Sequence, residues 1–172
     1  MGTLNAVYIR SAQPVTTTIK AKERTGYTIP GSSFYAVDLD SSEFGCPEDE
    51  ILQLSLSLQT DAIWITFQST ADVFVYHHCN KGSVVRSLCF GRFNEREWER
   101  IEGIPEPWEN ATFFDTKKLA FLLKYEKDKK RRDEIERFFN AGSLKLGSDI
   151  PGIDARESAR AIATFFNLPG WQ

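Results

Sequence analysis

Three apolar runs separated by very short breaks constrain the fold of this chain more than any other feature. Residues 61–68, 72–79 and 83–91 are rich in Val, Ile, Phe, Tyr and Trp, the residue types that favour β-strands. Breaks of about three residues leave no room for a crossover connection, so the runs are expected to form an antiparallel meander. At the second break, Gly82 supplies the left-handed residue of a bulged three-residue hairpin turn.

The lengths of the two breaks predict which side chains share a face of the meander. Three-residue turns pair Gln68 with Asp72 and Cys79 with Ser83. This register places on a core face Ile63, Ile65, Phe67, Val73, Val75, His77, Val85 and Cys89. The opposite face carries Trp64, Thr66, Phe74, Tyr76, His78, Val84, Arg86 and Leu88, with Tyr76 facing both Arg86 and Trp64. We interpret this amphipathic face either as covered by another layer or as a contact surface.

Signals ahead of the meander predict a second group of elements. A strand at residues 5–10 is followed by a helix that Ser11 and Pro14 open and that ends near Gly26, and then by a strand at 34–39. The two strands are parallel if the helix forms. Segment 47–59 is ambiguous, because Pro47 and the acids after it favour a helix start whereas its alternating leucines have the strand period. We favour the helix.

The prolines behind the meander predict a rigid strap. Residues 98–102 suggest a short fourth strand, after which Pro105 and Pro107 remove backbone donors and force an extended path. Trp108 at the end of this path needs a pocket for its large apolar area. We therefore expect Trp108 to be buried against the meander or the helix that follows.

The C-terminal part of the chain predicts helices. One begins at Asp115 or Thr116, and the mixed charges of residues 126–134 favour a solvated helix end or a helical hairpin. A last helix begins at Asp154. We predict a single globular α+β domain over residues 1–172, with a mixed, mainly antiparallel sheet of about five or six strands and helices packed on it.

Several of these segments together resemble a family of small uncharacterised bacterial proteins. The resemblance is carried by SLCFG after a strand containing YHH, by the strap WERIEGIPEPWE and by a closing helix that ends in NLPGW. It covers most of the chain, and its motifs are turn, strap and anchor residues. The resemblance implies one coherent fold and implies no catalytic residues.

Composition argues against several functional classes. The 21 basic and 24 acidic residues give a net charge of -3 and are mixed along most of the chain, so we predict no binding to nucleic acid or to an anionic membrane. The sequence has no long apolar stretch and no leader pattern, from which we expect a cytoplasmic protein. Its three cysteines at irregular spacing favour reduced thiols.

The polar residues predict no metal and no cofactor. His77, His78 and Cys79 form the one cluster of usual metal ligands, but neighbours in a strand point to opposite faces. His77 and Cys79 alone are too few to hold a metal ion. The acidic clusters lie in solvated contexts, and no glycine motif for phosphate binding occurs in the sequence.

Two functional hypotheses remain. The first is a non-enzymatic interaction or regulatory module that binds a protein partner, or itself, through the aromatic sheet face at Trp64, Tyr76 and Arg86. The alternative is a small-molecule-binding protein or weak hydrolase with a pocket near His78 and Arg86. The candidate binding residues are therefore Trp64, Tyr76, His78 and Arg86.

Overall fold

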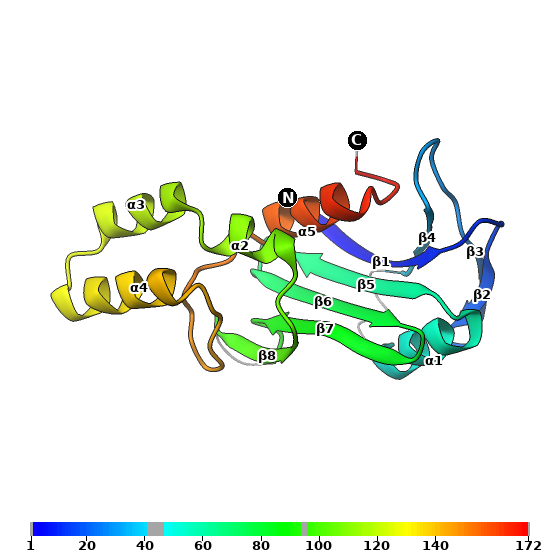
Figure 1. Cartoon of the computed structure of the whole chain (residues 1–172), viewed down its shortest axis with the longest axis horizontal. Helices are drawn as coiled ribbons and strands as arrows, with labels where there is room; N and C mark the ends of the chain where they lie inside the picture. The colour runs from blue at the N-terminus through cyan, green and yellow to red at the C-terminus, as the bar shows by residue number, and fades with distance from the viewer. Residues whose placement is uncertain (1, 41–46, 94–95, 172) are drawn as a thin grey trace.

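The computed structural model describes residues 2–40, 47–93 and 96–171 of the chain (Figure 1). Its strands form one six-stranded and one two-stranded sheet, which together with the helices confirm the α+β class. The elements are β1 Thr3–Arg10, β2 Thr16–Ile19, β3 Lys22–Thr25, β4 Phe34–Asp38, α1 Glu48–Leu58, β5 Asp61–Gln68, β6 Val73–Asn80, β7 Ser83–Phe90, β8 Trp98–Gly103, α2 Pro107–Phe113, α3 Thr116–Tyr125, α4 Lys129–Ala141 and α5 Ala155–Phe166.

The six-stranded sheet has the order β4-β1-β5-β6-β7-β8, and each of these neighbouring pairs is antiparallel. The predicted meander forms β5 to β7, and the predicted fourth strand follows it as β8. The prediction of a mixed sheet is wrong, because β1 and β4 pair antiparallel with Val7 opposite Val37. The chain between β1 and β4 forms a β-hairpin, so no helical crossover joins them.

That hairpin, β2–β3, replaces the helix that was predicted to end near Gly26. Lys20 and Ala21 both have positive φ angles, 54° and 57°, as the two-residue turn between these strands requires. Three consecutive threonines also disfavour a helix, because β-branched side chains lose rotamer freedom there. The spacing of Val15 and Ile19 suggested the apolar stripe of a helix. Both side chains are buried, but Val15 directly precedes strand β2 and Ile19 is its last residue.

Segment 47–59 is helical, as we favoured. Helix α1 follows Pro47 and carries Glu48, Asp49 and Glu50 in its first turn, where carboxylates stabilise the positive end of the helix dipole. The helix contacts β5, β6 and β7 and buries Ile51 in the interior.

Helices cover both faces of the six-stranded sheet (Figure 1). Helices α2 and α5 lie on one face, over a core that includes Phe34, Tyr76 and Trp98. The opposite face is covered by α1 and the β2–β3 hairpin, over a core that includes Val7 and Trp64. The sheet is therefore the middle layer of the fold.

Helices α3 and α4 form a helical hairpin that projects beyond one end of the sheet (Figure 1). Asp115 caps α3, as predicted. The centre of the hairpin is a small separate apolar cluster of Ile135, Phe139 and Ile150. Phe114 packs against both this cluster and the core under α5. The predicted helical hairpin is thus present as a lobe with its own small core.

The strap at Pro105 and Pro107 differs from the expected one in its second half. Its extended path ends at Glu106, and Pro107 is the first residue of α2, where its missing N–H costs nothing. Trp108 is buried, as predicted, and its ring packs edge-on against Tyr76 of the meander.

Candidate functional site

All four predicted binding residues lie in the interior. The exposed fraction is 1% for Trp64, 0% for Tyr76, 5% for His78 and 2% for Arg86. Trp108 of α2 covers Tyr76, Phe166 of α5 covers His78, and Glu109 of α2 covers Arg86. The expectation of an open aromatic sheet face is wrong, because the protein's own helices occupy that face.

Trp64 also lies on a different face from the other three site residues. The connection between β5 and β6 has four residues rather than three, so that Gln68 pairs with Val73. A shift of one residue turns every side chain of β5 to the other face relative to β6. Trp64 therefore lies on the α1 face, opposite His77 rather than Tyr76.

Tyr76, His78 and Arg86 do share a face, although their pairing differs from the predicted one. The turn between β6 and β7 is a two-residue turn with Lys81 and Gly82 at φ angles of 48° and 80°. A bulge directly after His78 shifts the register by one more residue, so Arg86 lies opposite His78 instead of Tyr76. Together the two shifts move the pairing by two residues. Because side chains alternate between faces with a period of two, Tyr76, His78 and Arg86 still share one face.

These three side chains belong to a buried polar network that joins the sheet to the start of α2 and that has the 46% exposed side chain of Arg10 at its edge. We define the network by its members, which are Arg10, Asp61, Tyr76, His78, Arg86, Glu106, Trp108 and Glu109. Glu106 and Glu109 were expected to be solvated acids, and this expectation is wrong, because both are largely buried. Their spacing of three residues around a proline is the capping-box signal that identifies them as a helix start.

Glu106 is the centre of the network. Its Oε2 accepts hydrogen bonds from the Tyr76 hydroxyl at 2.5 Å and the Trp108 indole at 2.9 Å, and its Oε1 lies 2.8 Å from His78 Nδ1. Burial raises the pKa of the Glu106 carboxyl, but these hydrogen bonds outweigh burial and hold the pKa below its ordinary value. Burial and the neighbouring Glu106 charge raise the pKa of Tyr76, which therefore stays a neutral donor.

His78 lies between two carboxylates. Its Nε2 is 3.2 Å from Asp61 Oδ1, while Nδ1 faces Glu106. Both contacts are hydrogen bonds when both ring nitrogens carry protons, so the imidazolium satisfies this geometry. Asp61 also pairs with Arg10 Nε at 2.6 Å. Burial raises the pKa of Asp61, but bonds from Asn80 and His78 and the Arg10 charge lower it below its usual value.

Arg86 is held on every side. Its Nε and Nη2 donate to the two carboxylate oxygens of Glu109 at 2.8 and 2.6 Å, the bidentate geometry of a strong ion pair. Its Nη1 donates to the backbone carbonyls of Glu102 at 3.2 Å and Gly103 at 3.0 Å. The backbone N–H of Glu106 also donates to Glu109, which completes the capping box of α2.

Three carboxylates of the network face two guanidinium groups and the His78 ring. Each of these groups is engaged by another group of the same chain. Removal of one partner from a buried ion pair leaves an uncompensated charge, so such a network ties its elements together tightly. We therefore interpret the network as a cross-link between β5, β6, β7 and the turn before α2.

A smaller polar group lies on the opposite face of the sheet. His77 Nδ1 is 3.1 Å from Ser87 Oγ, and Nε2 is 3.2 Å from Cys79 Sγ. Burial lowers the pKa of His77 and raises the pKa values of the Cys79 and Cys89 thiols to about 12, which excludes reactive thiolates at neutral pH. Cys46 lies outside the described residues. Within the described part of the chain, no three potential ligands are grouped to hold a metal ion.

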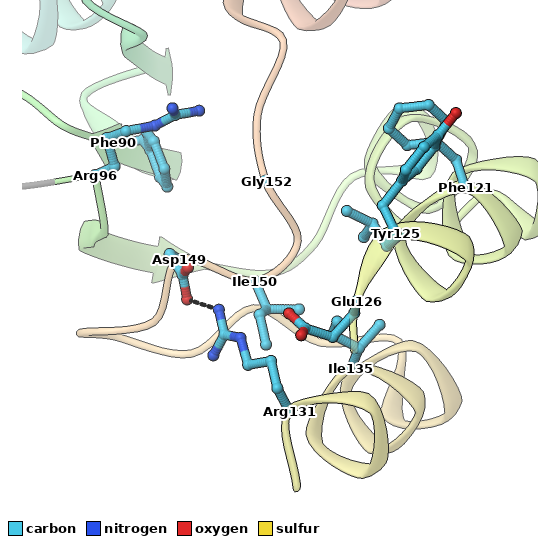
Figure 2. Close-up of a pocket in the computed structure, with 11 residues that line it drawn as sticks. Phe90, Arg96, Phe121, Tyr125, Glu126, Arg131, Ile135, Asp149, Ile150 and Gly152 are labelled. Carbon is cyan, nitrogen blue, oxygen red and sulfur yellow. Dashed lines mark hydrogen bonds and ion pairs between the residues drawn. The ribbon is translucent and has the colours of Figure 1, made fainter. Parts of the chain in front are cut away.

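An apolar cleft of about 450 Å³ lies between the α3–α4 hairpin and the end of the sheet (Figure 2). Its floor is formed by the buried side chains of Phe90, Ile135 and Ile150. Phe121 and Tyr125 of α3 form its lip, and each is 62% exposed. We name the cavity that these five residues line the hairpin cleft. Its floor joins residues from three distant segments, so no local sequence pattern predicts it.

Charged residues surround the hairpin cleft. Arg131 donates to Glu134 at 2.8 Å and also pairs with Asp149, toward which it points in Figure 2. The side chains of Arg131 and Asp149 are 31% and 53% exposed, so this ion pair is largely solvated and contributes little stability. Arg96 lies on the sheet side of the cleft. An apolar floor with a charged, solvated rim is typical of a binding surface.

The hairpin also concentrates positive charge. We define the hairpin lobe as residues 116–145, which hold ten basic and five acidic residues, a net charge of +5. The remaining 142 residues hold eleven basic and nineteen acidic residues, a net charge of -8. Local alternation of sign within 126–134 conceals this separation, which appears once the lobe is seen as a unit.

Comparison with known proteins leaves the function to be argued from this geometry. In the described part of the chain, no helix is both long and apolar enough to cross a bilayer. Searches with family models, among curated proteins and among solved structures each found no match. The resemblance to a family of small bacterial proteins therefore stays a prediction.

Proposed function

We propose that the protein is an interaction module that binds an acidic segment of a partner protein through the hairpin lobe. The observation that carries this proposal is the pair Phe121 and Tyr125 at the lip of the hairpin cleft, whose ring centroids are 4.9 Å apart. Exposed aromatic side chains beside a pocket are the residues that most often carry interface energy. None of the ten residues of α3 is fully buried, so the helix offers most of its surface to a partner.

The charge of the hairpin lobe selects the partner. A net charge of +5 on a projecting lobe attracts an acidic surface and repels a basic one. The hairpin cleft adds a requirement for a bulky apolar side chain, because its floor is apolar. The proposed ligand is therefore a protein segment that combines acidic residues with one large apolar residue.

A protein segment fits this surface better than a nucleic acid does. Arg131 is engaged by Glu134 and Asp149, and Arg132 donates to backbone carbonyls at the end of α3, including that of Glu126 at 3.1 Å. These two guanidinium groups are thus engaged by other groups of the chain and do not form a row for phosphates. A phosphate backbone also has no apolar group to fill the cleft.

The proposal keeps the functional class predicted from the sequence and moves the contact surface from the sheet to the lobe. A cavity of about 560 Å³ is lined by Arg86, Glu106 and Glu109 of the network. All three charged groups are already bonded to other groups of the chain, so we do not propose a hydrolase there. The free buried thiols of Cys79 and Cys89 support the cytoplasmic location that we also propose.

Selection from a random peptide library displayed on phage tests this function. The bait is the full chain, and a Phe121→Ser/Tyr125→Ser double variant serves for counter-selection. We expect enriched peptides to combine Asp or Glu with a bulky apolar residue and to bind the double variant at least tenfold more weakly. Their affinity should also fall as the salt concentration rises, because the attraction between exposed charges is screened.

A Phe165→Ser variant is the matched control, because Phe165 is 48% exposed on α5 and lies outside the lobe. It should bind the enriched peptides as the wild-type chain does. Enrichment of peptides that bind the double variant with unchanged affinity would contradict the proposal, and so would enrichment of basic peptides.

A further inference from the structure

We infer that the partner is a second copy of this chain, whose exposed turn at residues 102–105 inserts Ile104 into the hairpin cleft. This inference rests on the proposed function, since it names the acidic segment that the lobe binds. We call residues 102–105 the Ile104 turn. It comprises the last two residues of β8 and the first two residues of the connection to α2.

The Ile104 turn has the chemistry that the lobe requires. Ile104 is 80% exposed, the most exposed large apolar side chain among the described residues. Its neighbours Glu102, Gly103 and Pro105 are exposed as well, and Glu102 adds a carboxylate two residues away. The turn therefore presents one bulky apolar residue beside an acid.

The buried polar network holds this turn rigid. Gly103 has a φ of +83° and lies so close to β7 that a Cβ there would be 2.0 Å from the Val85 carbonyl oxygen. Arg86 donates to the carbonyls of Glu102 and Gly103, and Pro105 fixes the backbone that follows. The backbone on both sides of Ile104 is thus restrained, so little backbone entropy is lost when Ile104 binds. This gives Arg86 the role of a positioning residue.

The two surfaces of one chain match in size and are opposite in charge. The cleft has an apolar floor and a volume of about 450 Å³, sufficient for a branched aliphatic side chain. The hairpin lobe carries +5 and the rest of the chain, which includes the Ile104 turn, carries -8. Because the turn and the cleft are different patches, the contact between copies is heterologous and continues into a chain or a ring.

Sedimentation equilibrium over a wide concentration range tests this inference. One apolar side chain with a charged rim supports a weak contact, so we expect a dissociation constant on the order of 10 to 1000 µM. The average mass of the wild-type chain should rise beyond that of a dimer with concentration, and less so at high salt. Ile104→Ser and Phe121→Ser/Tyr125→Ser should each weaken association at least tenfold. Leu58→Ser, which removes a 48% exposed side chain from α1, should leave association unchanged.

Mixing the two variants gives the sharpest result. Ile104→Ser keeps an intact cleft, and Phe121→Ser/Tyr125→Ser keeps an intact turn, so an equimolar mixture should form one-to-one dimers that do not grow further. Restored binding in the mixture also shows that both variants are folded. A wild-type chain that stays monomeric throughout, or a mixture that does not associate, would overturn the inference.

The outcome for the proposed function is read separately. If a monomeric wild-type chain still binds the enriched acidic peptides through the lobe, self-recognition is refuted and the binding function stands. If peptide selection also fails, both are refuted.

Discussion

Removal of the Glu106 carboxylate should destabilise the protein more than removal of any solvated acid. Glu106 is 10% exposed and receives hydrogen bonds from Tyr76 and Trp108 while facing His78. Glu106→Ala leaves these buried donors without an acceptor and leaves the His78 ring with one carboxylate partner fewer. Loss of one partner from a buried pair costs about 3 to 5 kcal/mol. That is a large part of the roughly 5 to 15 kcal/mol that stabilises a typical domain.

The same carboxylate should make the protein sensitive to acid. The folded-state pKa of Glu106, like that of Asp61, lies below its ordinary value, so the unfolded chain binds these protons first. Their contribution to stability is therefore present above about pH 4.5 and is lost as pH falls through the folded-state pKa values. Glu106→Gln removes one of these two carboxyl groups, so the variant should lose less stability than wild type between about pH 5 and about pH 3.

Urea unfolding of wild-type protein, Glu106→Ala and Glu106→Gln at pH 7 and at lower pH measures both effects. Glu136 is exposed on α4, and Glu136→Ala is the matched control, with an expected change below about 0.5 kcal/mol. Glu106→Gln should lie between wild type and alanine, because its amide oxygen still accepts from some of the donors. A free energy of unfolding for Glu106→Ala within about 1 kcal/mol of wild type would refute the cross-linking role of the network.

Three further predictions follow from buried groups. Trp108→Ala should lower the free energy of unfolding by about 3 to 5 kcal/mol, because a buried ring is lost, whereas Lys130→Ala should leave the thermal midpoint nearly unchanged. Burial lowers the pKa of His77, so the unfolded chain binds a proton at this residue before the folded chain does as pH falls below 6.5. The thermal midpoint should therefore decline below pH 6.5, and His77→Gln should remove that decline. Cys79 and Cys89, whose pKa values are raised to about 12, should resist alkylation at pH 8 in the native protein and react in urea, as peptide mapping by mass spectrometry would show.

The meander was predictable because its signals are local. Each strand has its own run of β-favouring residues, and the breaks are too short for any connection except a hairpin. The register was harder, because one extra residue in the turn between β5 and β6 moves Trp64 to the other face. Tyr76, His78 and Arg86 kept their common face since two shifts of one residue compensate.

The burial of that face was not predictable from the same pattern. The sequence pattern of an amphipathic strand face is the same whether solvent or a helix covers that face. Here Glu106 and Glu109, at the start of α2, supply the carboxylates that pair with His78 and Arg86 of the sheet. The β2–β3 hairpin was mistaken for a helix because Val15 and Ile19 are four residues apart. Residues at this spacing share one face in a strand as well as in a helix.

The hairpin cleft required the tertiary structure. Its floor comes from Phe90, Ile135 and Ile150, which are separated by at least fifteen positions, and only packing brings them together. One signal was available in the sequence. Phe121 and Tyr125 are four residues apart on α3, away from the stripe of Leu119, Leu122 and Leu123 that packs inward. A second apolar stripe on a helix predicts that the helix contacts something besides its own core.

The central claim is that partners contact the hairpin lobe and not the aromatic sheet face. A titration of ¹⁵N-labelled protein with an enriched acidic peptide, followed by amide chemical shifts, tests it residue by residue. The account predicts that the largest shifts fall in residues 116–137 and 149–152. Largest shifts at Tyr76, His78 and Arg86, with the lobe unchanged, would contradict it and return the contact surface to the sheet.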